Sequence, residues 1–296
     1  MIHQNSAKEK FQKEAIMNYQ MTIEDISNYK EYLYHAERSA GTIEKYLRDI
    51  KAFLSWLSGR EASKENAAGW KEYLTEMSYV PATINSMLSA VNDFFRFMGW
   101  EECRVKLLHI QRKMFREQAR ALDRKEYLRL LHTAQQQGKE RLRLLMETIC
   151  STGIRVSEVK YITIEAILNG RTDISLKGKI RTILLPQKLC RKLRKYAKKR
   201  GIKKGQIFIA KNGNSLSRTQ IWKEMKALCE SAGVEPSKVF PHNLRHLFAS
   251  SFYNVCKDVV RLADVLGHSS IETTRIYLIT TETEHARQLE RMRLII

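Results

Sequence analysis

Four separate segments of this sequence carry side chains that can bind or react with a phosphodiester. The first runs from Ser151 to Glu158, where a glycine-containing turn delivers Arg155 to the start of an expected helix. The planar fork of an arginine matches two phosphate oxygens, and a helix N-terminus adds its own positive end. An arginine at a helix start is also a common surface residue, so this segment alone is weak evidence.

The second segment, Pro241 to His246, begins another expected helix and sets His242 and Arg245 three residues apart. Side chains at that spacing share a helix face and could converge on one phosphate. His242 and His246 also have the i, i+4 spacing of a zinc-binding helix. Asn243 stands where that motif needs a glutamate, and Arg245 would put a positive charge beside the cation. We therefore expect no metal site here.

The third segment extends from Leu266 to Tyr277, and within it Ser269 and Glu272 have the side chains of a capping box. A helix that starts just after His268 would present the phenol of Tyr277 about two turns later. A tyrosine between two aliphatic residues is by default a buried core residue. Tyr277 would be a nucleophile only if the other reactive side chains lie next to it in the fold.

The fourth segment is the turn of a predicted β-hairpin with Lys177 and Lys179, which is either a movable cationic finger or a solvated turn. Together the segments supply a phenol, two guanidinium groups, two imidazoles and an ammonium group, with no metal ligands. Arginine donors in a dry site stabilise the charge of a pentacoordinate phosphorus transition state. The set therefore suits attack of a phenol on a phosphodiester without a metal ion.

Apolar residues at helical spacing predict the elements of a small N-terminal domain. A capping box at Thr22 and Asp25 starts one helix, and a second follows Gly41. Further helices are expected over 66–78 and from Pro81. We expect a helical domain over 21–100, preceded by an N-terminal extension at 1–20. The charged face of the second helix is expected to hold Glu44, Lys45, Arg48, Asp49 and Lys51.

Residues 101–120 break the helical period and carry six Lys or Arg against three Glu, which is typical of a basic linker on a phosphate backbone or of a solvated connector. A capping box at Asp123 and Glu126 then starts a second domain over 121–296. Helices at 124–135 and 140–151, another from about Arg155, and the β-hairpin follow. The predicted fold class is mainly α with a small β-hairpin, an α+β protein.

The charge balance predicts a polyanionic partner. The 296 residues carry a net charge of +20 and are 43% hydrophobic, which excludes a disordered basic tail protein. Thirteen Lys or Arg and no acidic residue lie between Lys177 and Gly205, so a helix at 188–200 would be basic almost all round. A membrane-surface or calmodulin-binding helix would need a broader apolar side. We favour DNA as the partner.

The compartment is expected to be the cytoplasm, in association with the nucleoid. No apolar run approaches a membrane span, and the N-terminus does not resemble a signal peptide. The five cysteines are widely spaced and never form C-x-x-C, so we expect reduced thiols, without disulfides or a zinc knuckle.

The order of the motifs resembles the tyrosine recombinases, the family of phage integrases, Xer recombinases and mobile-element integrases. The matching motifs are T-G-x-R-x-S-E at 152–158, K-G-K at 177–179, H-x-L-R-H-x-F-A at 242–249, L-G-H-S at 266–269 and Tyr277. The resemblance implies a two-domain clamp, with a SAM-like helical core-binding domain at 21–100 and a catalytic domain with a C-terminal helix at 121–296.

The resemblance also implies the catalytic residues. They would be Arg155, Lys177, His242, Arg245, His268 and Tyr277, supported by Glu158. The two arginines would clamp the scissile phosphate, and Tyr277 would attack it to form a 3′-phosphotyrosyl link. Lys177 would protonate the leaving 5′ oxygen, the two histidines would bind the phosphate and assist proton transfer, and Glu158 would brace the arginine and histidine side chains.

One departure from the family concerns the lysine. The family commonly has G-K-G in the hairpin, whereas Leu176 precedes Lys177 here. We favour Lys177 over Lys179 as the general acid. The residues predicted to contact DNA are Lys179, Arg181, Lys188, Arg191, Lys192, Arg104, Lys106, Arg112 and Lys113.

The implied product is a recombined pair of DNA sites. A homotetramer on two duplexes would exchange strands through a Holliday junction, without ATP, metal or another cofactor. An apolar stripe on the last helix, with Ala286, Leu289, Met292 and Leu294, would dock in a neighbouring subunit or pack on its own domain. The alternatives are a type IB topoisomerase with the same chemistry and a catalytically silent DNA-binding regulator.

Overall fold

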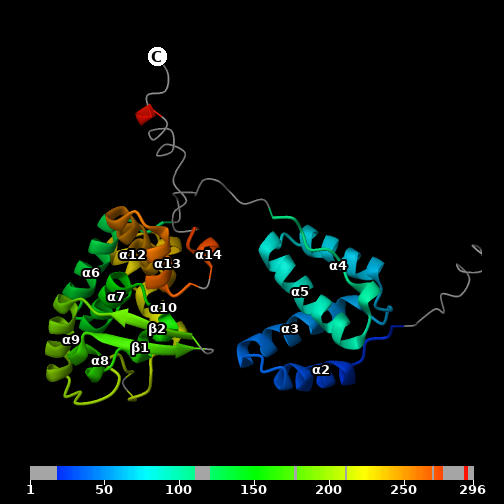
Figure 1. The fold of residues 1–296 in the computed structure, drawn as a ribbon, viewed down its shortest axis with the longest axis horizontal. Coiled ribbons are helices and arrows are strands. Elements are labelled where there is room, and N and C mark those ends of the chain that lie inside the picture. Colours follow the sequence, from blue (N-terminus) through cyan, green and yellow to red (C-terminus); the bar gives the residue numbers. More distant parts are fainter. Residues whose placement is uncertain are drawn as a thin grey trace, which may run out of the picture. The chain divides into compact units, whose positions relative to one another are not determined.

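The computed structural model describes residues 19–110, 121–176, 179–210, 212–268, 270–275 and 290–292, with the backbone alone of Leu176, Lys179, Glu272 and Arg275. The chain divides into two compact units, Met1–Arg112 and Lys113–Ile296. The described residues form helices and one two-stranded antiparallel sheet, as Figure 1 shows. The predicted fold class is confirmed. No helix among these residues is long and apolar enough to span a bilayer.

The described residues of the first unit form four α-helices and a short 3₁₀ turn. Their bounds are α2 (Ile23–His35), α3 (Ala40–Leu57), α4 (Lys64–Glu76), α5 (Pro81–Met98) and η1 (Glu101–Cys103). The Thr22 and Asp25 capping box forms as predicted, and α5 begins at Pro81. Large aromatic side chains from different helices, such as Phe53, Trp70 and Phe94, fill a common core.

Asp49, predicted on the charged face of α3, is buried. The side chain is 2% exposed, and it forms ion pairs with Lys45 and Arg48. A buried carboxylate is tolerated only when charged or hydrogen-bonded partners replace water, and these two cations do so. The helical period identified the apolar face of α3 correctly but did not show how far the neighbouring helix covers Asp49.

Residues that follow η1 belong to the first unit. Cys103 is 1% exposed and Val105 8%, and both pack on the aromatic core. The Asn92 amide donates to the Val105 carbonyl and accepts from its N–H, and Asn85 does the same for Leu108. Side-chain amides thus replace the missing backbone partners of an extended segment. The expected linker of 101–120 is therefore anchored to the helical unit up to Leu108.

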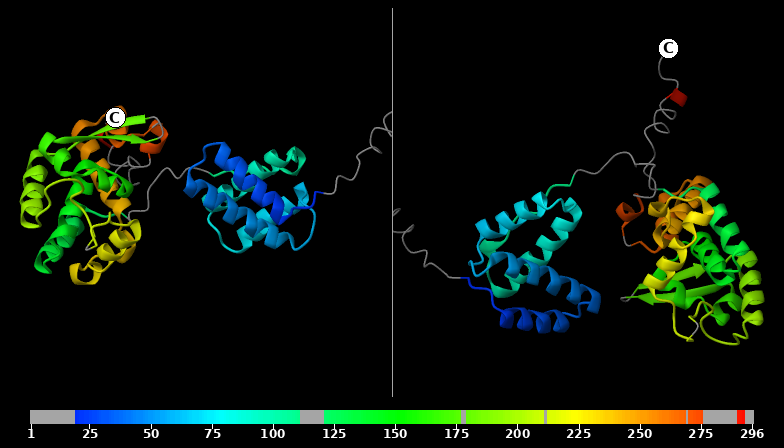
Figure 2. Two further views of the ribbon diagram at one scale, coloured as in Figure 1. Left: turned by 90° about the horizontal axis from the view of Figure 1, so that it is seen from below. Right: turned by 180° about the vertical axis from the view of Figure 1, so that it is seen from behind.

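The second unit is a helical body with a β-hairpin on one side. Its first elements are α6 (Arg124–Gln136), α7 (Glu140–Thr152), η3 (Val156–Tyr161), α8 (Ile164–Asn169), β1 (Arg171–Leu176), β2 (Lys179–Leu184) and α9 (Gln187–Lys199). The later elements are α10 (Arg218–Lys226), α11 (Cys229–Ala232), η4 (Pro236–Lys238), α12 (Pro241–Cys256), α13 (Val259–Leu266) and α14 (Ile271–Arg275). Both views of Figure 2 show α13 and α14 on the same unit as the hairpin.

Two details of this unit differ from expectation. The helix expected from Arg155 is a six-residue 3₁₀ helix, η3, and Glu158 accepts from the Arg155 backbone N–H at 2.8 Å. The basic helix α9 is less self-repulsive than its composition suggests. Glu147 on α7 binds Lys192 at 2.7 Å, and Glu140 binds Lys199 at 2.9 Å.

Candidate active site

Arg155 and Glu158 form the first part of the site, directly after α7. Gly153 ends α7 with a φ of +64°, and a Cβ there would lie 2.4 Å from the Phe248 ring. Only glycine fits this turn without strain. The chain then presents Arg155, whose Nη1 donates to Glu158 Oε1 at 2.9 Å and whose Nη2 donates to the Gly267 carbonyl at 3.3 Å. Its side chain is 41% exposed, whereas that of Glu158 is 1% exposed.

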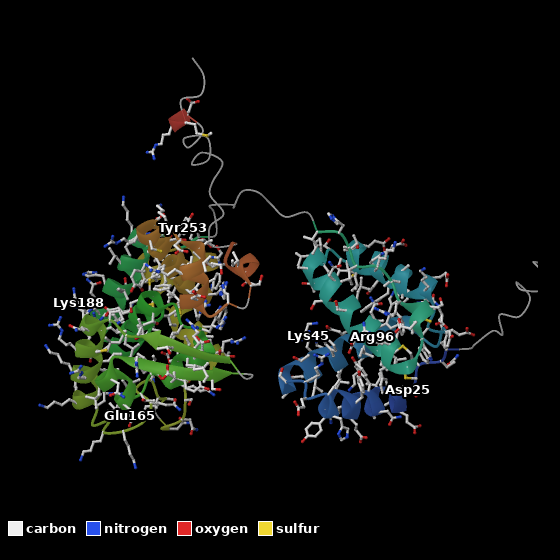
Figure 3. The ribbon with its side chains drawn as sticks, in the orientation of Figure 1. Asp25, Lys45, Arg96, Glu165, Lys188 and Tyr253 are labelled. Carbon is white, nitrogen blue, oxygen red and sulfur yellow. The ribbon has the colours of Figure 1, made fainter. Side chains whose placement is uncertain are left out.

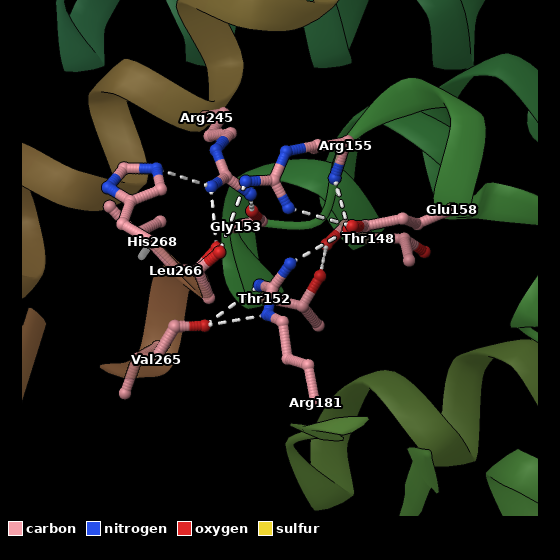
Figure 4. A network of polar contacts seen from close by, with 11 residues as sticks. Thr148, Thr152, Gly153, Arg155, Glu158, Arg181, Arg245, Val265, Leu266 and His268 are labelled. Carbon is pink, nitrogen blue, oxygen red and sulfur yellow. Dashed lines mark hydrogen bonds and ion pairs between the residues drawn. The ribbon is translucent and has the colours of Figure 1, made fainter. Parts of the chain in front are cut away.

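Arg245 on α12 enters the same site from the other side. It is 2% exposed, its Nη1 donates to the Gly153 carbonyl, and its Nη2 donates to the Leu266 carbonyl at 2.7 Å. Figure 4 shows Arg155 and Arg245 in one network of polar contacts. Ninety residues separate them in sequence, and the packing of α12 on α7 and α13 brings them together.

His268 follows α13 and completes this side of the site. Its Nε2 lies 2.9 Å from Arg245 Nη2, and its Nδ1 lies 2.7 Å from Thr274 Oγ1. A guanidinium can only donate, so Nε2 is the acceptor and the ring proton sits on Nδ1, which donates to Thr274. Burial and the nearby charges of Arg245, Arg155 and Arg181 lower the pKa of His268 to about 4. The imidazole is neutral near pH 7.

Arg181 on β2 is the third guanidinium of the cluster. Its Nη1 donates to Glu158 Oε2 at 2.9 Å, and its Nε and Nη2 donate to the Val265 carbonyl at 3.1 and 2.8 Å. Burial lowers the pKa of Arg181 to about 10, against the opposing effect of Glu158. Arg155 and Arg181 both bind Glu158, and Arg245 lies in the same network, so these four side chains keep an excess of two positive charges. An anion is the natural complement.

A cavity of about 530 Å³ opens beside the clamp formed by Arg155 and Arg245, and both arginines line it. His242, at the start of α12, lines the same cavity and is exposed. The apolar wall of the cavity includes Trp222 and Phe240, and Arg218 adds another positive charge to the lining. The cavity thus combines a positive corner with an apolar wall, which can hold a phosphate group together with the sugar or base attached to it.

Comparison with known protein families identifies the second unit. The model of the phage integrase family matches residues 120–284. The chain belongs to the phage integrase family. A second model, the phage integrase N-terminal SAM-like domain, matches residues 26–102 of this integrase.

The sequence of the integrase aligns with those of known recombinases over most of its length. It is 28% identical to the tyrosine recombinase XerA of Thermococcus kodakarensis over 274 residues, which cover 90% of this chain and 94% of XerA. It is 27% identical to the tyrosine recombinase XerD of Vibrio cholerae, over 84% of this chain and 88% of XerD. These matches confirm the resemblance drawn from the motifs and the prediction of a tyrosine site-specific recombinase.

Solved structures share the fold of the integrase. A lambda integrase (75-356) dimer bound to a COC′ core site aligns with a TM-score of 0.69 at 18% identity, covering 87% of this chain and 95% of that one. The XerH site-specific recombinase bound to palindromic difH substrate aligns with a TM-score of 0.66 at 21% identity, covering 83% of this chain and 78% of that one. At these identities the likeness concerns the fold.

The structure brings together five of the predicted site residues: Arg155, Glu158, His242, Arg245 and His268. Lys177, Tyr277, Arg112 and Lys113 lie outside the described residues, as does Ser269 of the expected capping box. Of the expected C-terminal helix, only residues 290–292 are described.

The remaining residues predicted to contact DNA have different surroundings. Lys188 and Arg191 are exposed on α9, and Figure 3 shows Lys188 on the outside of the second unit. In the first unit Lys106 is exposed, while Arg104 pairs with Glu101. Arg181 lies inside the site. Its side chain is only 10% exposed and its donors face Glu158 and Val265, and its contact with DNA stays a prediction.

Sequence reasoning missed the internal position of Arg181, although a signal was present. Alternate residues of a strand share one face, and Arg181 is two residues from Ile183, which is 3% exposed. It also stands opposite Ile174, which is 1% exposed. The strand pattern therefore directs Arg181 inward. Thr274, Arg218 and Trp222 were missed as well, and no local pattern distinguishes them from ordinary helix residues.

Proposed function

We propose that this integrase cleaves and rejoins DNA at specific sites through a covalent 3′-phosphotyrosyl intermediate. One observation carries the proposal. Arg155 and Arg245, from distant parts of the chain, meet in one positively charged corner beside an open cavity that His242 also lines. Two arginines that line one cavity suit a phosphodiester, whose non-bridging oxygens gain negative charge in the transition state.

In the proposed reaction the phenol oxygen of Tyr277 attacks the scissile phosphorus. A bond forms between this oxygen and phosphorus, and the bond from phosphorus to the 5′ oxygen breaks. Lys177 donates a proton to the leaving 5′ oxygen. The 5′-hydroxyl of a second strand then attacks the phosphotyrosyl phosphorus and releases Tyr277. The phosphodiester is conserved in the enzyme link, so the exchange consumes no nucleotide cofactor.

The state of His268 suggests how the phenol loses its proton. A tyrosine of ordinary pKa near 10 needs a base or a strong positive field to react at neutral pH. Nε2 of the neutral His268 ring accepts from Arg245, so the imidazole fixes the arginine, and the positive field of Arg155 and Arg245 promotes loss of the phenol proton to solvent. His242, which lines the cavity, supplies a further hydrogen bond to the phosphate. Glu158 holds Arg155 in place through its Oε1 atom.

The proposed partner is a double-stranded DNA recombination site. The net charge of +20 and the exposed cations of α9 support binding to the DNA backbone. XerH and lambda integrase, which share the fold, were solved bound to DNA sites. We further propose four subunits on two duplexes, with the C-terminal segment exchanged between neighbours, and action on cytoplasmic, nucleoid-associated DNA.

A suicide substrate tests the proposal. Fragments of the chromosomal DNA next to the protein's own gene serve as the probe, and a bound fragment is rebuilt with a nick just 3′ of the cleavage site. The short 5′-hydroxyl strand then diffuses away and traps the protein on the DNA. We expect an SDS-resistant adduct with the wild-type chain and none with Tyr277→Phe, which should bind the same duplex equally well.

Other outcomes identify the alternatives. Tight binding of the duplex without formation of any covalent adduct would show that the protein is a DNA-binding regulator without catalytic activity. An adduct combined with relaxation of supercoiled DNA, but without exchange of strands between two sites, would favour a topoisomerase. Exchange of strands between two copies of the bound fragment supports the recombinase.

A further inference from the structure

Arg181 is held on every side by the protein. Its three guanidinium nitrogens donate to Glu158 and to the Val265 carbonyl, and its side chain is 10% exposed. An arginine is buried only where its donors find partners, because desolvating the charge is costly. Figure 4 shows the guanidinium between Glu158 and Val265, so its three nitrogens are all engaged by protein acceptors.

Glu158 connects Arg181 to Arg155. One carboxylate oxygen accepts from Arg155 Nη1 at 2.9 Å, and the other accepts from Arg181 Nη1 at 2.9 Å and from the Arg155 backbone N–H at 2.8 Å. The carboxylate is therefore fixed at both oxygens. Without Arg181, one side of Glu158 would lose its charged partner, and the direction of the Arg155 guanidinium would be less well defined.

The other contacts of Arg181 fix the last turn of α13 and Gly267 after it. Gly267 has a φ of +62°, and a Cβ at this position would lie 2.2 Å from Cδ of Arg181, so the arginine stem packs directly on the glycine backbone. The same segment supplies the Gly267 carbonyl to Arg155 and the carbonyl of Leu266, the last residue of α13, to Arg245. It leads directly into His268. One side chain on β2 thus touches the supports of both clamp arginines.

We propose that Arg181 is a positioning residue for the phosphate clamp. It orients Arg155 through Glu158 and holds the Val265–Gly267 backbone that supports Arg245 and precedes His268. Arg181 itself does not touch the phosphate. This inference rests on the proposed function and extends it, because it names a residue on which the rate of cleavage depends but which takes no part in DNA binding.

The geometry requires an arginine at this position. The fork donates in one direction to a carboxylate and in another to a carbonyl, and lysine has a single nitrogen at the end of a flexible stem. Arg181→Lys can keep the ion pair with Glu158 or the bond to Val265, whereas Arg181→Gln loses the charge. We expect the cleavage rate to fall in the order wild type, Arg181→Lys, Arg181→Gln.

A double-mutant cycle on the nicked duplex tests the inference. The single-turnover rate of adduct formation is measured for the wild type, Arg155→Ala, Arg181→Gln and the double variant. Misplacing a catalytic group by about 1 Å can cost about 100-fold in rate, and we expect a loss of this order for Arg181→Gln with unchanged affinity for the duplex. In the Arg155→Ala background, the same substitution should cost much less, because the two residues act together.

Several results would overturn the inference. If Arg181→Gln lowered the single-turnover rate by the same factor in the wild-type and Arg155→Ala backgrounds, the effect would be general destabilisation. If it left the rate unchanged, Arg181 would be dispensable. Weaker DNA binding with a normal rate would make Arg181 a DNA contact. Urea unfolding identifies a variant that does not fold, in which case Arg181→Lys is taken through the same cycle. The wild-type adduct tests the proposed function separately, since a chain that forms none refutes recombinase chemistry whatever Arg181 does.

Discussion

Nε2 of His268 lies 2.9 Å from Nη2 of Arg245, and this contact determines the protonation of the ring. A guanidinium offers only donors, so the imidazole must present a lone pair to it. Protonation of His268 would replace this hydrogen bond by contact between two positive charges. The site therefore holds a base in its neutral form close to the cations that are proposed to bind phosphate.

The first prediction concerns the titration of His268. Its pKa is lowered to about 4 from an ordinary value of 6.5, so we expect its ring resonances in the DNA-free protein to stay in the neutral form well below pH 6.5. The unfolded chain takes up this proton near pH 6.5, and the folded chain takes it up only near pH 4. Folding stability should therefore fall as the pH is lowered through this window.

NMR of selectively labelled histidine follows the titration, and urea unfolding at several pH values follows the stability. His268→Asn serves as the control, because it should remove this part of the pH dependence. Titration of the wild-type ring near pH 6.5 would contradict the arrangement.

The second prediction concerns Thr274, which is fully buried and lies 2.7 Å from Nδ1 of His268. Thr274→Val keeps the shape and removes the acceptor, so the ring loses the bond that keeps its proton on Nδ1. A hydrogen bond of this kind contributes about 1 kcal/mol, which corresponds to roughly a fivefold slower single-turnover cleavage.

Thr274→Ser should restore most of the rate. The matched control is Thr273→Val, since Thr273 is exposed and donates to the Ser270 carbonyl, away from the imidazole. Equal rates for the two valine variants would argue against a role of Thr274 in orienting His268.

The third prediction compares three glycines with left-handed backbone. Gly153, Gly170 and Gly267 have φ values of +64°, +69° and +62°. Alanine at Gly170 meets no atom within 4 Å, so it should cost only the backbone strain, about 1 kcal/mol of unfolding free energy. Alanine at Gly153 or Gly267 would also overlap Phe248 or Arg181, which adds about 1–3 kcal/mol. Urea unfolding measures the free energy of unfolding of the three alanine variants. A similar loss of stability in all three would contradict the prediction, because it would show that Phe248 and Arg181 can move away at little cost.

The fourth prediction separates DNA contacts from internal cations. Lys188 and Arg191 are exposed on α9 and are predicted to contact phosphates. Replacing either by alanine should reduce the slope of log affinity against log salt by about 0.9 for each lost contact. Arg181→Gln should leave that slope unchanged. Fluorescence anisotropy at several salt concentrations measures it, and an unchanged slope for both α9 variants would exclude them as phosphate contacts.

Much of this protein could be predicted from local sequence pattern. Capping boxes at Thr22 and Asp123, the proline at the start of α5 and the hairpin strands are set by interactions within a few residues, and the structure contains all of them. The segments with Arg155, Arg245 and His268 could also be recognised, because each places its reactive side chain beside a turn or a helix start.

Which of these side chains meet was decided only by the packing of the helices. A helical period shows which face is buried but not what covers it, so neither the burial of Asp49 nor the pairing of Lys192 with Glu147 followed from the sequence. The sharing of Glu158 by Arg155 and Arg181 depends on the approach of a strand to a 3₁₀ helix, and Glu158 and Arg181 are 23 residues apart in the sequence. The composition, the approximate helix and strand positions and the order of the reactive groups can be predicted from the sequence, because none of them depends on contacts between distant segments. The charge, hydrogen bonding and protonation of the site arise from contacts between distant segments, and those exist only once the chain has folded.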